Sequence, residues 1–321
     1  MTTTITIDIA GGQIGGAARY AAEVYGYLQR SARDDIRVIG MKRRLTPAWL
    51  ALREAAAVRR SRRVALNNVG FFTPGGERWT LLAGPLHFLT PPEMAAQVPE
   101  VRTKISRQIP VVHRAARKSD VLIAPCTAMA ERITATLPEV ADRVVVRMHP
   151  VSANPIPRQP GGSLILCPVL FAPQKQMPDR LAEWLAAVDQ VLDESVRMIV
   201  TANVTEVPTS LATSSRLEFV GRLDHSDLCH LWARSRAVYF PSGMESFGFP
   251  LAEARVNGQP VIAQDTPMNR EIAGPALCGY KVGDADSLRQ ATEAAMTALI
   301  APDPEPFDPD AYFDWLLGSG Q

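Results

Sequence analysis

The chain has 321 residues, more than one ordinary hydrophobic core requires, and this length fits two domains of about 150 residues each. Its composition, 46% hydrophobic and 21% charged, is typical of a folded protein and excludes a disordered chain, while a formal net charge of +1 gives no global argument for nucleic acid as a partner. No stretch approaches the roughly 18 uncharged apolar residues that a membrane span requires.

The N-terminal half predicts alternating strands and helices. Residues 1–9 lack the basic and long apolar regions of a signal peptide and predict a first strand. Short β-branched or aliphatic runs then alternate with segments of helical periodicity, which is typical of parallel α/β architecture. Strands are predicted at 4–9, 36–39, 64–68, 79–83, 121–124 and 144–147, and helices at 16–30, 47–59, 100–116 and 128–136.

The C-terminal half begins the same pattern again. Proline and glycine crowd residues 150–162, which indicates a linker. We therefore predict an N-terminal domain at 1–155 and a second domain at 156–302. The tail, 303–321, carries four aromatic residues that predict a helix returning to the N-terminal domain: Phe307, Tyr312, Phe313 and Trp315. In the second domain, strands are predicted at 163–168, 197–201, 217–220, 237–240 and 261–263, with helices between them.

The cysteines give no sign of a metal site or of disulfides. All four are isolated in the sequence, with no zinc-like spacing: Cys126, Cys167, Cys229 and Cys278. We interpret them as reduced core residues. Together with the absence of a signal peptide, they predict a cytoplasmic protein.

Segment 240–254 combines a strand end, a loop of small residues and a helix start. Pro250 suits the first helical position, so backbone N–H groups around 247–251 would lie at a helix N-terminus, a natural place for a diphosphate. Glu245 in the loop and Glu253 one turn inside the helix can both point into a cleft, where carboxylates accept hydrogen bonds from sugar and ribose hydroxyls. Two glutamates eight residues apart can also simply flank a helix.

This segment resembles the Glu-x7-Glu motif of the retaining, family-four (GT-B) glycosyltransferases, including its Phe-Gly-x-Pro core. The similarity runs from 219–223 through 260–263 to 270–274 in family order, and more weakly over most of the chain. The resemblance implies an α/β protein of the GT-B type, with two Rossmann-like parallel-sheet domains facing across a cleft. It also implies a nucleoside diphosphate sugar as donor substrate and no cofactor.

The resemblance assigns roles to residues of the second domain. Glu253 is implied to hold the ribose hydroxyls of the donor nucleotide, and Glu245 to lie near the hydroxyls of the transferred sugar. The backbone amides of Ser246, Phe247 and Gly248 are implied to face sugar and phosphate. The base pocket is implied to be lined, largely through the backbone, by Val220, Gly221 and Arg222.

Lys175 ends the loop after the first strand of the second domain, near the mouth of the predicted cleft. In the family this loop carries an Arg and, five residues later, a Lys, which together neutralise the departing nucleoside diphosphate. Here the Lys is Lys175, but Leu170 occupies the Arg position. Losing such a cation can cost a few kcal/mol of transition-state stabilisation. Arg180 or Arg222 could replace it, and Lys175 could instead be an ordinary surface lysine.

The glycine-rich segment 11–20 separates the first strand from the first helix. It does not fit Gly-x-Gly-x-x-Gly, which disfavours a nicotinamide cofactor. It is similar to the family's Gly-Gly-x-x-Arg loop, which approaches the donor phosphate and the acceptor, with Gly15 and Gly16 as counterparts and Arg19 on the helix. A plain tight turn is the alternative.

The acceptor-side motifs depart further from the family. The usual His-Asp pair after the fourth strand is replaced by Gly84 and Pro85. His87, three residues on, faces either the active site or the core, and Cys126 stands where the family often has serine. These departures leave the acceptor and the activity itself open.

Residues 42–63 form a basic segment with Trp49, Leu50 and Leu52 interleaved and Glu54 as its one acid. The pattern fits an amphipathic surface that meets anionic lipid or a phosphorylated acceptor, or else a solvated helix face. Its cations are Lys42, Arg43, Arg44, Arg53, Arg59, Arg60, Arg62 and Arg63.

We therefore expect a metal-independent, retaining transfer of a sugar from a UDP- or GDP-linked donor to a small-molecule, lipid or saccharide acceptor. By resemblance, the leaving phosphate takes the acceptor proton. Peripheral contact with the inner face of the membrane through 42–63 is an open alternative to a purely cytoplasmic location, and no nucleic-acid partner is expected. Two other readings remain: a catalytically silent GT-B protein that binds nucleotide or acts as a partner subunit, and a GT-B enzyme of different output, such as a phosphorylase or an epimerase.

Overall fold

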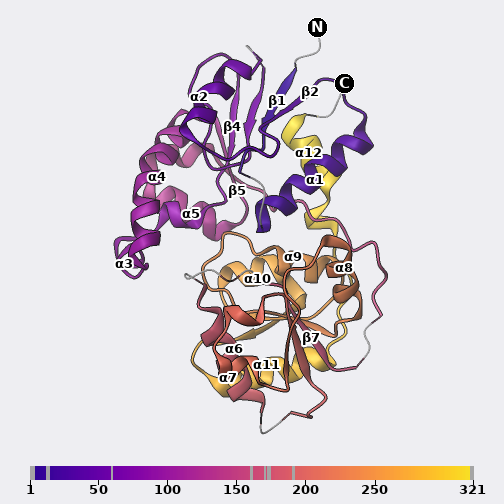
Figure 1. The fold of residues 1–321 in the computed structure, drawn as a ribbon. Helices are drawn as coiled ribbons and strands as arrows, with labels where there is room; N and C mark the ends of the chain where they lie inside the picture. The colour runs from indigo at the N-terminus through magenta and orange to yellow at the C-terminus, as the bar shows by residue number, and fades with distance from the viewer. Residues whose placement is uncertain are drawn as a thin grey trace. The chain divides into compact units, whose positions relative to one another are not determined.

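The computed structural model describes residues 4–11, 15–58, 61–159, 162–169, 171, 175–189 and 192–318, and it divides the chain into two compact units (Figure 1). Unit 1 consists of Met1–Pro150 with Phe307–Gln321, and unit 2 of Val151–Pro306. Both boundaries lie within a few residues of the predicted ones. The first falls earlier because the linker already lies along unit 2, where the Asn154 amide donates to Asn257 Oδ1 at 2.8 Å.

Unit 1 contains a six-stranded parallel sheet in the order β2-β1-β3-β4-β5-β6. The strands are β1 (Ile5–Asp8), β2 (Ile36–Ile39), β3 (Arg63–Ala65), β4 (Arg78–Leu81), β5 (Val121–Ala124) and β6 (Val144–Val146). The helices are α1 (Gly15–Ser31), α2 (Pro47–Ala56), α3 (Pro91–Ala95), α4 (Pro99–Lys118) and α5 (Thr127–Thr136), with 3-10 helices η1 (Pro85–Phe88) and η2 (Pro138–Arg143). Ile7, Val64 and Leu122 of its strands are fully buried, as expected for a parallel sheet covered on both faces.

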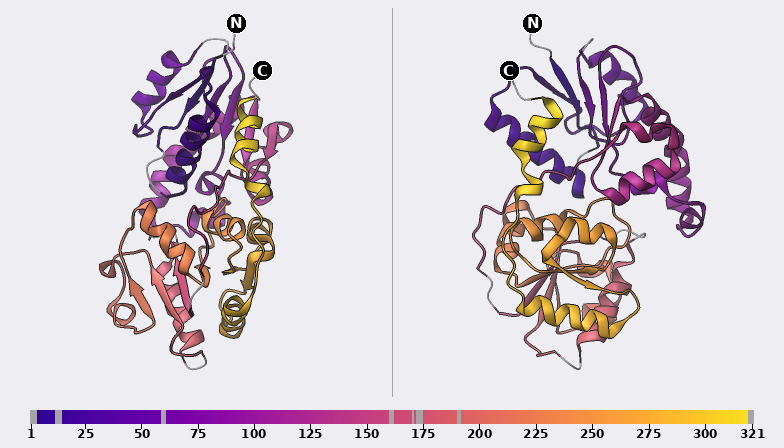
Figure 2. Two further views of the ribbon diagram at one scale, coloured as in Figure 1. Left: turned by 90° about the vertical axis from the view of Figure 1, so that its right-hand side faces the viewer. Right: turned by 180° about the vertical axis from the view of Figure 1, so that it is seen from behind.

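The C-terminal tail belongs to unit 1, where α12 (Pro309–Leu317) packs against α1 (Figure 2). The Tyr20 hydroxyl donates to the Tyr312 hydroxyl at 2.8 Å, and the Tyr27 hydroxyl donates to Asp314 at 2.7 Å. Three of the four predicted aromatic residues are buried: Phe307, Tyr312 and Phe313. The fourth, Trp315, is half-buried, and its ring centroid lies 5.3 Å from that of Trp79. The tail therefore completes the core of unit 1.

Unit 2 contains a second six-stranded parallel sheet in the order β12-β11-β10-β7-β8-β9. The strands are β7 (Leu164–Cys167), β8 (Arg197–Val200), β9 (Leu217–Phe219), β10 (Ala237–Phe240), β11 (Val261–Gln264) and β12 (Leu277–Tyr280). The helices are α6 (Met177–Val188), α7 (Thr209–Ala212), α8 (His225–Arg234), α9 (Phe249–Val256), α10 (Pro267–Ala273) and α11 (Ala285–Thr297), with 3-10 helices η4 (Val204–Glu206), η5 (Gly274–Ala276) and η6 (Glu305–Phe307).

The expectation of two parallel α/β domains is confirmed, but β12 was not predicted. Gly279 interrupts its short apolar run, and glycine weakens a strand signal. The glycine has a packing reason, since a Cβ at this position would lie 3.0 Å from Asp265 Cβ on the neighbouring chain segment. In the part of the chain that the structure describes, no helix is long and apolar enough to cross a membrane.

Candidate active site

The candidate site lies at the carboxyl edge of the unit 2 sheet, where two adjacent strands end. Strands β7 and β10 pair in parallel, so the loops that follow them begin side by side. Lys175 comes from the loop after β7 and Glu245 from the loop after β10. Their side chains form an ion pair with Nζ 2.7 Å from Oε1, and they are 22% and 18% exposed. The structure thus brings together two residues that lie 70 positions apart in the sequence.

Glu245 is oriented by a second contact within its own loop. The buried Ser242 hydroxyl donates to Glu245 Oε1 at 2.8 Å, so this oxygen accepts from both an ammonium and a hydroxyl. Ser242 was not among the residues predicted from the sequence. Its signal was a hydroxyl three residues before the glutamate, a spacing at which a turn brings the two side chains together.

Helix α9 starts one residue before the predicted position, at Phe249, and Gly248 precedes it as the N-cap. Gly248 has φ 77°, and a Cβ there would lie 2.9 Å from the Phe240 ring, so glycine is required both by the backbone and by the packing. Ser246 is half-buried and Phe247 is 1% exposed, so any ligand contact of Phe247 would be through its backbone. This geometry turns the chain sharply from the Glu245 loop into the start of a helix.

Glu253 lies on α9 and is only 6% exposed. Its backbone carbonyl accepts from the Asn257 side-chain amide at 2.7 Å. A carboxylate is rarely buried to this degree without a partner that stabilises its charge. Glu253 is therefore a buried carboxylate of unit 2 and not a surface residue that happens to flank a helix.

The three residues predicted to line a base pocket follow β9. The Val220 amide donates to the Val200 carbonyl at 3.1 Å, and the Gly221 amide donates to the Ala202 carbonyl at 2.9 Å. Gly221 has φ 73°. Arg222 is exposed. Because β8 separates β9 from β7, this group lies two strands along the edge from the strand that leads to Lys175.

The structure bears on which cation could replace the missing arginine. Leu170 lies outside the described residues. Arg180 Nη1 donates to both carboxylate oxygens of Glu183, at 2.9 and 2.8 Å, so Arg180 is already committed to an ion pair. Arg222 is exposed at the end of β9 and is the remaining candidate of the two.

The other predicted site residues belong to unit 1. Gly15 and Gly16 are the first residues of α1, and Gly15 has φ 61°, while residues 12–14 of that loop lie outside the described part. His87 lies in η1, with its Nε2 3.1 Å from Gln108 Oε1, and burial lowers its pKa below the usual value. A Cβ at Gly84 would lie 2.6 Å from His87 Nδ1, so the imidazole occupies the space that a side chain at Gly84 would need.

The basic segment 42–63 does not form one continuous charged surface. Arg53 is fully buried, with Nη1 2.6 Å from Asp8 Oδ2, because Asp8 at the end of the interior strand β1 is itself fully buried and its charge needs a partner. Arg63 is also buried, and its guanidinium donates to Thr73. Arg59 and Arg60 lie outside the described residues. Among the described cations of the segment, the exposed ones are Lys42, Arg43 and Arg44, in the loop before α2.

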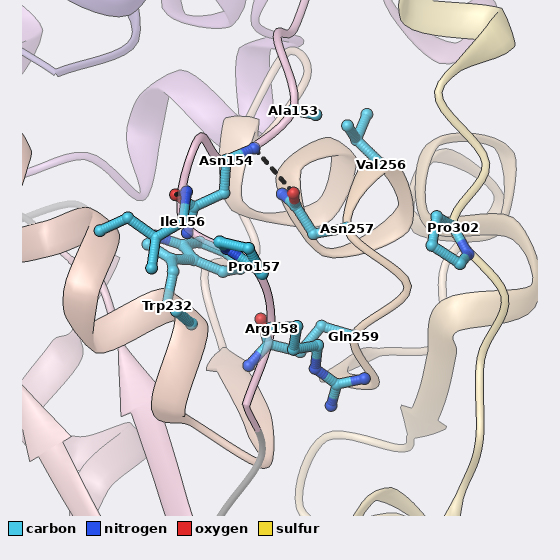
Figure 3. A pocket seen from close by; sticks show the side chains of 11 residues that line it. Ala153, Asn154, Ile156, Pro157, Arg158, Trp232, Val256, Asn257, Gln259 and Pro302 are labelled. Carbon is cyan, nitrogen blue, oxygen red and sulfur yellow. Dashed lines mark hydrogen bonds between the residues drawn. The ribbon is translucent and has the colours of Figure 1, made fainter.

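Unit 2 also contains a pocket of about 210 Å³ beneath the linker (Figure 3). Linker residues 153, 154 and 156–158 form one wall, and Trp232, Asn257 and Gln259 lie around it. Gln259 Nε2 donates to the Ser235 carbonyl at 2.8 Å, just before β10 begins. The pocket is therefore at the amino edge of the sheet, opposite to the Lys175–Glu245 pair. Among the described residues, no group of three or more His, Cys, Asp or Glu side chains is placed to hold a metal ion.

Comparison with known proteins finds a family match within unit 2. Residues 206–302, which include Glu245 and Glu253, match the family model of the glycosyl transferases group 1. The serotype-specific mannosyltransferase WbdA of Escherichia coli is 42% identical over 60 residues, which is 19% of this chain and 7% of that protein. O-antigen chain mannosyltransferase B of Escherichia coli is 31% identical over 72 residues, 22% of this chain and 19% of that protein. The matched segments thus span less than a fifth of these relatives.

Solved structures extend the likeness over the whole chain. WaaG, a glycosyltransferase involved in lipopolysaccharide biosynthesis, matches 98% of this chain and 100% of that one, with a TM-score of 0.65 and 16% identity. Sucrose-phosphate synthase from Thermosynechococcus elongatus matches 99% of this chain and 100% of that one, with a TM-score of 0.63 and 12% identity. The chain therefore has the GT-B fold, and its residues 206–302 match the family model of the glycosyl transferases group 1.

Proposed function

We propose that this protein is a retaining glycosyltransferase that moves a sugar from a UDP- or GDP-linked donor to a small-molecule, lipid or saccharide acceptor. The observation that carries the proposal is the 2.7 Å contact between Lys175 Nζ and Glu245 Oε1 at the carboxyl edge of the sheet. Ligands of open α/β sheets bind at this edge. Glu245 also lies inside the segment that matches the group 1 family.

The chemistry follows from the charges at the site. As the bond from sugar to phosphate breaks, negative charge grows on the leaving diphosphate, and a preorganised ammonium with N–H groups at a helix start stabilises it. Lys175 and the residues that lead into α9 would supply both. Glu245 would accept hydrogen bonds from the sugar hydroxyls and Glu253 from the ribose. The leaving phosphate would take the proton from the acceptor, so that neither a metal ion nor a further general base is required.

A basic surface on unit 1 fits an anionic acceptor or an anionic lipid surface. Unit 1 contains 22 Lys and Arg against 15 Asp and Glu, whereas unit 2 contains 12 against 18. In the loop before α2, Met41 (54%), Lys42, Arg43 and Arg44 are exposed, and on α2 itself Leu52 (58%) is exposed. Exposed cations beside exposed apolar side chains are the features of a peripheral membrane surface. We therefore propose that the protein is cytoplasmic and contacts the membrane peripherally through this loop.

The second candidate is a catalytically silent protein that binds nucleotide or serves as a partner subunit. The observation that favours it is the Arg180–Glu183 pair, because it leaves Lys175 without the second cation that Arg180 would have supplied.

Donor turnover separates the two candidates. UDP-, GDP- and ADP-sugars would be incubated with the protein, including mannosyl donors because two of the matched relatives are named mannosyltransferases. Nucleoside diphosphate release and the anomeric configuration of the product would be followed. Lys175→Ala should lower turnover by roughly 10²–10³, the scale for one preorganised donor, with a smaller loss of nucleotide affinity.

Lys281→Ala is the matched control, because it removes an exposed lysine from the same unit. The catalytically silent candidate would be established instead by two results together: the wild-type protein turns over none of the donors, and Lys175→Ala binds nucleotide as tightly as wild type.

A further inference from the structure

Gln264 is a buried amide that ties together the ends of two strands. It is the last residue of β11 and only 7% exposed. Its Nε2 donates to the carbonyl of Pro241, the residue that directly follows β10, at 2.7 Å. Its own backbone carbonyl accepts from Asn269 Nδ2 at 2.7 Å, and Asn269 is 1% exposed. The bond to Pro241 continues the contact between β10 and β11 past Phe240 and Ala263, the last residue pair of their ladder, and the bond from Asn269 ties the end of β11 to α10.

The loop that carries Glu245 packs directly on this amide. A Cβ at Gly243 would lie 3.0 Å from Gln264 Oε1 and 3.2 Å from Gln264 Nε2, so the backbone at Gly243 is in close contact with the side chain. Ser242, between the two contacts, is 1% exposed and donates to the Glu245 carboxylate. The amide therefore fixes the first part of the loop, and the loop fixes the carboxylate.

We infer that Gln264 is a positioning residue for Glu245, which it holds toward Lys175 by fixing the 241–243 backbone. The expected effect on catalysis rests on the proposed function, in which Glu245 accepts hydrogen bonds from the sugar hydroxyls. In this role Gln264 acts through the loop and not through a contact with the substrate. A buried side-chain amide that is hydrogen-bonded in only one geometry favours one conformation of the loop, because any other conformation would leave buried polar groups without hydrogen bonds.

Two near-isosteric substitutions test the role. Gln264→Met keeps the volume but removes the donor, and sugar transfer should fall between about tenfold and hundredfold, as expected for a group displaced by a fraction of an ångström to an ångström. Gln264→Glu also removes the donor at neutral pH and sets a charge against the Pro241 carbonyl. At low pH the introduced carboxyl becomes protonated and can donate to that carbonyl, and burial favours this neutral form.

The activity of Gln264→Glu relative to wild type at the same pH should therefore recover as the pH falls, whereas that of Gln264→Met should not. The affinity for nucleoside diphosphate, measured by calorimetry, should stay within about twofold, because the nucleotide is assigned to Glu253 and to the loop after β9. Unchanged turnover in Gln264→Met, or nucleotide affinity falling in parallel with turnover, would overturn the inference in favour of no role or a merely structural one.

Amide hydrogen exchange gives a readout that does not need activity. In Gln264→Met, exchange across 241–248 should accelerate by about tenfold or more, since the loop opens locally without global unfolding. Gln259→Met is the matched control: Gln259 is also buried and donates to a backbone carbonyl, but at the amino edge of the sheet. Equal exchange across 241–248 in the two variants overturns the inference. A wild-type protein without turnover would refute the proposed function alone, because the exchange comparison still decides the role of Gln264.

Discussion

Glu253 is a carboxylate that is 6% exposed on a helix within the matched family segment. If it holds the ribose hydroxyls, Glu253→Ala should weaken nucleoside diphosphate binding by about 1–3 kcal/mol, the range for losing a hydrogen bond to a charged group. Calorimetry with UDP and GDP measures this directly. Glu245→Ala is the comparison, and it should act on sugar-dependent turnover and leave nucleotide affinity near that of wild type. Equal nucleotide affinity in wild type and Glu253→Ala would show that the assignment is wrong.

His149 is a second buried ionisable residue, in unit 1, with its ring centroid 5.0 Å from that of Tyr20. Burial lowers its pKa from 6.5 to about 3. The folded protein therefore holds His149 neutral over a range in which the unfolded chain binds a proton. Its contribution to stability is complete above pH 6.5 and is lost as the pH falls toward the folded pKa, with a slope of up to about 1.4 kcal/mol per pH unit.

Urea titrations at a series of pH values below 6.5 should therefore show stability falling in the wild type and a flatter dependence in His149→Phe. The control is His230→Phe, which changes an exposed histidine of unit 2. Parallel curves for wild type and His149→Phe would mean that another group causes the acid destabilisation.

At the scale of elements, α12 is held by its aromatic face. Phe313 is fully buried, with ring centroids 5.1 Å from Tyr27 and 6.1 Å from Tyr20, both on α1. Phe313→Ala should lower the free energy of unfolding by about 3–5 kcal/mol, because truncation of a buried aromatic leaves a cavity. Asp310→Ala is the control, since its ion pair with Arg30 is exposed and should contribute less than about 1 kcal/mol. Similar losses in the two variants in denaturant titrations would contradict the view that the apolar face holds the tail.

At the scale of the whole molecule, a net charge of +1 conceals opposite excesses in the two units, basic in unit 1 and acidic in unit 2. Arg43→Ala/Arg44→Ala should therefore weaken binding to vesicles of phosphatidylcholine with anionic phosphatidylglycerol by about 2 kcal/mol, at about 1 kcal/mol per basic residue near the surface. The matched control, Arg197→Ala/Arg234→Ala, removes the same charge from exposed positions of unit 2. Vesicle sedimentation at two salt concentrations measures both. Equal binding by the two double variants, or binding that is independent of salt, would exclude this loop as the contact surface.

The sequence by itself determined the α/β class and the positions of most strands to within one or two residues. It also determined that Glu245 lies in a loop, that Gly248 precedes a helix and that Glu253 lies on that helix. These features depend on near neighbours in the chain. Residue periodicity defines strands and helices, and glycine and proline define the turns between them. The edge strand β12 was not predicted because Gly279 weakens its strand pattern. This glycine is explained only by its packing against Asp265, which the sequence does not show.

Tertiary structure alone decided which distant residues meet. Lys175 reaches Glu245 because β7 and β10 are neighbours in the sheet, an order that no local pattern specifies. Arg53 reads as a surface cation in its sequence, yet it is buried because Asp8, on a different element, requires a partner in the core. Gln264 likewise has no motif and acts through a carbonyl 23 residues away. Burial and strand order depend on contacts across the whole packed sheet. Local sequence patterns therefore do not predict them, and only the folded structure shows them.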